Sequence, residues 1–168
     1  PPVAFGRLGN GSETGWLLLD GLSLKAIGHT TFAATLPSRL AALGTLVMIG
    51  VIAHRLRDQL DPIICLLIAA SMIWMLHFGR TGFRAVGAMF LFTIALDGLV
   101  NLLRDPKRIW PAVRIGVALA LGLWTYTTIR CAVLALIVFG VWQIVASTCR
   151  NDGLTRTWIN RFALIGAI

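Results

Sequence analysis

The stretch from residue 85 to residue 103 limits what this chain can fold into more than any other. It reads AVGAMFLFTIALDGLVNLL, is apolar over nearly its whole length, and has Arg84 and Arg104 at its two ends. A helix rises about 1.5 Å per residue, so this stretch is just long enough to cross a hydrocarbon core of about 30 Å. We therefore predict a membrane-spanning helix here.

One narrow polar stripe runs along this predicted helix. Thr93, Asp97 and Asn101 follow each other at intervals of four residues, so they share one face. An ionised carboxylate at that depth costs about 3 kcal/mol or more, so Asp97 needs a partner or a water path. The partners that the sequence offers are Arg130, Gln143 and Ser147.

The stripe has two interpretations. It could be a buried contact that locks two helices together, or it could be a relay for protons or cations. A relay generally needs more than one carboxylate inside the membrane, and this chain offers Asp97 alone. We therefore favour the structural interpretation over transport.

The composition excludes an ordinary soluble domain. Of the 168 residues, 57% are hydrophobic and 13% are charged, against roughly 25% charged in an average soluble domain. The net charge of +8 comes from basic residues between the apolar runs, where they contact lipid phosphates. They form no continuous stripe of the kind that a nucleic-acid backbone needs. We predict an all-α, polytopic membrane bundle whose partners include membrane lipids and exclude nucleic acid.

The apolar runs predict about five transmembrane helices. The N-terminal region, 1–37, reads as an interfacial and loop region, 38–150 as the helical bundle, and 151–168 as a C-terminal segment that could start a further helix. The predicted spans are 40–53, 63–78, 85–103, 113–129 and 131–148.

Local signals set the boundaries of these spans. Pro37 and Ser38 are expected to begin the first span, and Asp61 with Pro62 the second, as cap and first helical residue. TYTTIR, at 125–130, is interpreted as a tight turn in preference to one long bent helix. The bias of Lys and Arg places the N-terminus outside, in what we expect to be a bacterial inner (cytoplasmic) membrane.

The histidines raise the question of a cofactor. His54 and His77 end two successive spans, which puts them on opposite membrane faces and excludes them as two axial ligands of one haem. His77 alone could ligate a haem or chlorophyll shared with another subunit, although we favour a water-facing histidine. The three cysteines show no CxxC spacing, so we expect no metal site.

Catalytic motifs are absent from the sequence. It contains no nucleophile elbow, phosphate-binding loop or HExxH pair, and Glu13 is its single glutamate. We therefore expect a non-enzymatic, structural subunit of a larger membrane assembly, partnered by other membrane subunits or copies of itself. One alternative is an oligomeric channel, holin-like or transport protein with a pore lined by Asp97 and Asn101. A second is a haem- or chlorophyll-associated subunit of an electron-transfer or light-harvesting complex.

Overall fold

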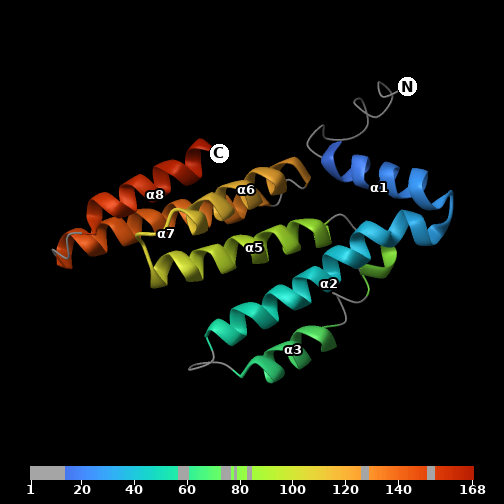
Figure 1. The fold of residues 1–168 in the computed structure, drawn as a ribbon, viewed down its shortest axis with the longest axis horizontal. Helices are drawn as coiled ribbons and strands as arrows, with labels where there is room; N and C mark the ends of the chain where they lie inside the picture. The colour runs from blue at the N-terminus through green and yellow to red at the C-terminus, as the bar shows by residue number, and fades with distance from the viewer. Residues whose placement is uncertain are drawn as a thin grey trace.

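The described part of the chain is entirely helical apart from its connections. A computed structural model describes residues 14–56, 61–72, 77, 79–82, 85–125, 129–150 and 154–168, and no strand occurs among them. The predicted all-α fold is confirmed. The helices are α1 (Thr14–Ile27), α2 (Thr31–Arg55), α3 (Pro62–Ser71), α5 (Ala85–Arg104), α6 (Trp110–Thr125), α7 (Ile129–Arg150) and α8 (Thr155–Ala167), as Figure 1 shows.

Three helices, not five, are long and apolar enough to cross a membrane. Within the described ranges these are α2, α5 and the part of α7 from Ile129 to Cys149. The second and fourth predicted spans correspond to α3 and α6, which are apolar but only 10 and 16 residues long. The prediction of five spans is therefore wrong. Three such helices still indicate a multi-pass integral membrane protein.

The three long helices run in one direction, and α6 runs back between two of them (Figure 1). Arg55, at the end of α2, lies beside Asp97 near the end of α5, so these two helices run in parallel. The start of α7 likewise lines a cavity together with the start of α5. The three long helices thus run in one direction, and α3 and α6 lie between them in the sequence (Figure 1). α3 and α6 are apolar like the long helices, but they are shorter: α6 is only about 24 Å long at 1.5 Å per residue.

The start of α2 differs from the prediction. The helix begins at Thr31, with Thr30 as its cap: the Thr30 hydroxyl accepts a hydrogen bond from the backbone N–H of Ala33 at 3.1 Å. Pro37 therefore lies inside the helix, and Ser38 is a buried helical residue and not the cap. A proline in a helix lacks the N–H that would bond the carbonyl four residues earlier, which here belongs to Ala33.

The neighbouring helix α1 supplies the missing hydrogen bond. The hydroxyl of Ser23 donates to the Ala33 carbonyl oxygen at 2.6 Å. The carbonyl that Pro37 leaves free inside α2 is thus satisfied by α1, and the same bond fastens the two helices together. Pro37 is tolerated in α2 because α1 packs against it.

Two other local predictions are confirmed. The Asp61 carboxylate caps α3 by accepting hydrogen bonds from the N–H groups of Ile63 and Ile64 at 2.8 and 3.3 Å, with Pro62 as the first helical residue. Between α6 and α7 the chain forms two helices and not one, with the middle of the expected turn, 126–128, outside the described residues.

Small residues set how closely the helices pack around α5. Gly87 faces the ring of Trp16 in α1, and a Cβ atom at Gly98 would lie 2.7 Å from Cγ1 of Ile115 in α6. Close approach through small residues is how membrane helices gain contact without a hydrophobic drive between them. α5 consequently lies at the centre of the bundle, with α2 on one side and α6 on the other. The main buried cluster of the bundle joins residues of α5, α6, α7 and α8: Ala88, Ala95, Leu102, Ile115, Ala118, Leu119, Ile129 and Trp158.

The hydrogen bond between α1 and α2 gives a first prediction. Ser23→Ala should lower the free energy of unfolding by about 1–2 kcal/mol, because it leaves the Ala33 carbonyl unsatisfied. In a Pro37→Ala background the restored N–H bonds that carbonyl, so the same change should cost less than about 0.5 kcal/mol. Unfolding of the four proteins in mixed micelles of mild and denaturing detergent measures this coupling. An equal cost in both backgrounds would contradict the compensation.

Candidate functional site

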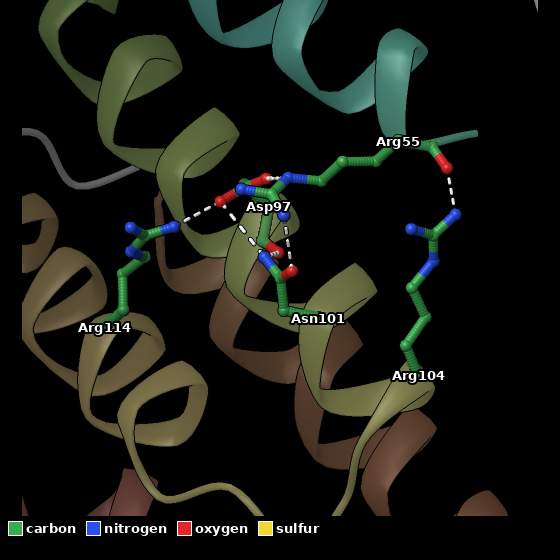
Figure 2. A network of polar contacts seen from close by, with 5 residues as sticks. All are labelled: Arg55, Asp97, Asn101, Arg104 and Arg114. Carbon is green, nitrogen blue, oxygen red and sulfur yellow. Dashed lines mark hydrogen bonds and ion pairs between the residues drawn. The ribbon is translucent and has the colours of Figure 1, made fainter. Parts of the chain in front are cut away.

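Asp97 is the buried charge around which the polar residues of the bundle gather. It lies on α5, seven residues before the end of that helix, and is fully buried. Arg55 is the last residue of α2, and Arg114 lies in the first two turns of α6. Because α2 runs parallel to α5 and α6 antiparallel to it, both arginines reach Asp97 from opposite sides (Figure 2).

Three side chains contact the Asp97 carboxylate. Nε of Arg55 lies 2.8 Å from Oδ1 in an ion pair that lacks the angle of a hydrogen bond. Nη1 of Arg114 pairs with Oδ2. Nδ2 of Asn101 donates to Oδ2 at 3.2 Å and to the Asp97 backbone carbonyl at 2.7 Å. Oδ1 of Asn101 in turn accepts a hydrogen bond from Nη1 of Arg55 at 2.8 Å. The contacts therefore form one connected network across three helices.

The charges in this network are unequally exposed. The Asp97 side chain is 1% exposed, whereas the side chains of Arg55 and Arg114 are 36% and 49% exposed. The carboxylate is thus sealed inside the protein, while each arginine extends from it toward the surface. Arg104 continues the network outward by donating from Nη2 to the carbonyl oxygen of Arg55, which satisfies an end group of α2.

The structure assigns the polar stripe differently from the sequence. Asp97 and Asn101 act together, but the Thr93 hydroxyl donates to the Phe90 carbonyl of its own helix at 2.7 Å. The expected partners Arg130, Gln143 and Ser147 all lie on α7, and two arginines from α2 and α6 take their place. Ser147 instead lies 3.1 Å from the hydroxyl of Thr155 in α8.

Sequence reasoning missed Arg55 and Arg114 for an identifiable reason. Both lie at the ends of apolar runs, where arginines usually mark the membrane surface. Asp97 is only about 10 Å from the end of α5, at 1.5 Å per residue, so an arginine at the end of a neighbouring helix can reach it. The position of Asp97 near the helix end was the available signal, and the predicted alternation of spans already put the first and third in one direction. Which arginines turn inward to the carboxylate could not be read from the sequence.

A cavity of about 850 Å³ opens beside the network, between α5 and α6. At its polar end lie arginines from α2, α5, α6 and the connection before α6, together with the 80% exposed Trp110. Asp105 also lies there and pairs with Arg108 at 2.9 Å. The remaining wall is apolar. The residues of this arginine-lined cavity are Arg55, Leu91, Ile94, Asn101, Arg104, Asp105, Arg108, Trp110, Pro111, Val113, Arg114, Val117, Ala118 and Leu121.

The other candidate ligand, His77, is exposed, and its backbone carbonyl accepts a hydrogen bond from Thr81 at 3.1 Å. Across the described ranges, no group of three or more histidine, cysteine or acidic side chains is arranged to hold a metal ion. A cofactor role for His77 stays a prediction.

Comparison with known protein families, with characterised proteins and with solved structures finds no match to this chain. A sealed carboxylate held by two arginines is a fixed charge cluster that joins α2, α5 and α6.

The burial of Asp97 leads to a second prediction. Replacing both Arg55 and Arg114 by Met should lower the free energy of unfolding by about 3–5 kcal/mol, because the buried carboxylate then has no counter-charge. Adding Asp97→Asn should recover most of that loss. Detergent unfolding of the double and triple variants checks this, with Asp105→Asn as the control, since its exposed pair with Arg108 is worth less than about 1 kcal/mol. A triple variant no more stable than the double variant would contradict it.

A second half-buried carboxylate, Asp20 on α1, has a different environment. Its Oδ1 atom is buried, and no described group donates a hydrogen bond to it. Burial raises the pKa of Asp20 above its usual value of 3.8, because a charged carboxylate loses more solvation than a neutral one.

This raised pKa gives a third prediction, on pH dependence. The folded protein binds the Asp20 proton more tightly than the unfolded chain, so stability falls as the pH rises through the interval between the unfolded and folded pKa values. Asp20→Asn should therefore raise the unfolding temperature at pH 7, and the gain should shrink as the pH falls toward 4. A gain that is the same at both pH values would mean that the charge of Asp20 is not its cause.

Proposed function

We propose that this chain is a small, non-enzymatic integral-membrane subunit of a larger membrane assembly, with a structural role. The observation that carries the proposal is the outer face of α7. This helix is the most apolar of the three candidate spans and the least buried within the chain. Its exposed apolar residues recur at intervals of three and four, which places them on one side of the helix: Leu134, Ile137, Val138, Val141, Trp142 and Val145.

Trp142 distinguishes this face from one that meets only lipid. Its side chain is 67% exposed, yet it lies eight residues, about 12 Å, before the end of α7. Tryptophan on a lipid-facing surface concentrates at the headgroup level and not in the hydrocarbon, whereas it is enriched at the centres of protein interfaces. A neighbouring subunit packed on α7 would cover it.

The position of Asp97 favours a structural role over conduction. A pore lined by Asp97 and Asn101 would need the carboxylate to face water at an oligomer axis. Instead the side chain is buried within one chain and compensated by Arg55 and Arg114. Because Arg55 and Arg114 compensate Asp97 within the chain, the polar stripe needs no partner subunit, and the exposed face of α7 is the feature that favours one.

We also propose an orientation. Arg55, Arg104 and Arg114 lie at one end of the bundle, and Arg161 of α8 joins them there by donating to the carbonyls of Pro106 and Lys107. The positive-inside rule assigns that end to the cytoplasm, in a bacterial inner membrane on our proposal. The start of α2 then faces outside.

Photo-crosslinking at Trp142 tests the subunit proposal. With benzoylphenylalanine in place of Trp142, irradiation of native membranes should give a discrete protein adduct. The same probe at Leu67, on the exposed face of α3, should crosslink chiefly to lipid. Mass spectrometry identifies the adduct as another membrane protein or a second copy of this chain, and an absorption spectrum of the purified assembly reports any pigment. Lipid adducts alone at Trp142, with a colourless monomer after mild extraction, would overturn the proposal.

A further inference from the structure

The arginine-lined cavity does not end at its apolar wall. A second cavity of about 850 Å³ lies next to it along α5, and both are lined by Leu91 of α5 and Leu121 of α6. No charged side chain lines the second cavity, whose walls come from α1, α2, α5 and α6. Together the two cavities form a groove over α5 that is strongly basic at one end and apolar along the rest.

The basic end of the groove carries more positive than negative charge. Four arginines and one carboxylate, that of Asp105, line it, and the buried carboxylate of Asp97 lies behind Arg55 and Arg114. Asp97 is shared between Arg55 and Arg114, and Asp105 pairs with Arg108. Among the described residues no carboxylate pairs with Arg104, which is exposed and donates only to a backbone carbonyl. An anion placed here would meet the unpaired guanidinium of Arg104 and those of Arg108 and Arg114, whose side chains are 76% and 49% exposed.

The dimensions of the apolar part match half of a bilayer. From Asn101, at the basic end, to Leu91, where the two cavities meet, α5 rises ten residues, or about 15 Å. The hydrocarbon core is about 30 Å thick, so one leaflet supplies chains of about that reach. Val117 and Leu121, which line this part, are 43% and 46% exposed, so the groove is accessible from outside the chain.

We propose that this groove binds one anionic phospholipid. The phosphate lies between Arg104, Arg108 and Arg114, because guanidinium groups bind phosphate oxygens through paired hydrogen bonds. Trp110, at the mouth, packs beside the headgroup as interfacial tryptophans do. The acyl chain follows Leu91, Val117 and Leu121 toward the second cavity. This inference concerns the isolated chain and does not depend on the subunit proposal.

Charge and shape together favour a lipid over a free phosphate ion. A free anion would bind the arginines but would leave the apolar wall exposed. A zwitterionic lipid would cover the wall, but it would bring the positive charge of its headgroup close to the arginines. An anionic lipid matches both parts of the groove.

Native mass spectrometry of the full chain in detergent tests the proposal, with phosphatidylglycerol and phosphatidylcholine added in equal amounts. One phosphatidylglycerol should bind in preference. Arg104→Gln with Arg108→Gln should weaken its binding by about fivefold per arginine, since a basic residue near an anionic surface contributes about 1 kcal/mol. The matched control is Arg39→Gln with Arg80→Gln, at two exposed arginines toward the other end of the bundle. It should leave phosphatidylglycerol binding unchanged.

Two further measurements test the apolar wall and the basic end of the groove separately. Val117→Trp fills the apolar wall without changing a charge and should weaken phosphatidylglycerol binding, whereas excess inorganic phosphate should displace it poorly. Equal binding of both lipids, or equal losses in the Arg104/Arg108 and Arg39/Arg80 variants, would overturn the proposal. Full displacement by inorganic phosphate, with no effect of Val117→Trp, would overturn it in favour of a simple anion site.

Discussion

A carboxylate inside the apolar part of a bundle persists only if opposite charge reaches it, because removing an unpaired ion from water costs several kcal/mol. In this chain the charge is Asp97, and the opposite charge comes from helices on both sides of α5. The requirement fixes more than one side chain. Arg55 can reach Asp97 only if α2 runs parallel to α5, and Arg114 only if α6 runs back along it. The arrangement of α2, α5 and α6 is therefore coupled to one buried ion.

The sequence predicted the parts of this fold that depend on local chemistry. The central helix, the Asp61–Pro62 start of α3 and the break before α7 follow from apolar length, capping residues and a limit on span length, all of which act over a few residues. The boundary at Pro37 failed for the opposite reason. A proline normally marks the first turn of a helix, but here a hydroxyl from another helix compensates for its missing N–H, and that contact is tertiary.

The residues of the candidate site also differ in whether local sequence or tertiary contact reveals them. Asp97 and Asn101 could be singled out because a polar stripe in an apolar helix is visible in the sequence. Their partners could not, since an arginine at the end of an apolar run has the same appearance whether it contacts lipid phosphates or turns inward to a carboxylate. The number of spans failed similarly: α3 and α6 are as apolar as true spans, and only the positions of the helix ends distinguish them.

The hydrogen bond from Ser23 to Ala33 joins residues only ten positions apart, so it also bears on how the chain is made. α1 and α2 can complete this contact once both have left the ribosome, without any contribution from a later helix. Asp97 enters the membrane when Arg55 has already been synthesised, and Arg114 follows 17 residues later. The order of synthesis thus makes Arg55 available to Asp97 from the start, and only the second counter-charge, Arg114, follows.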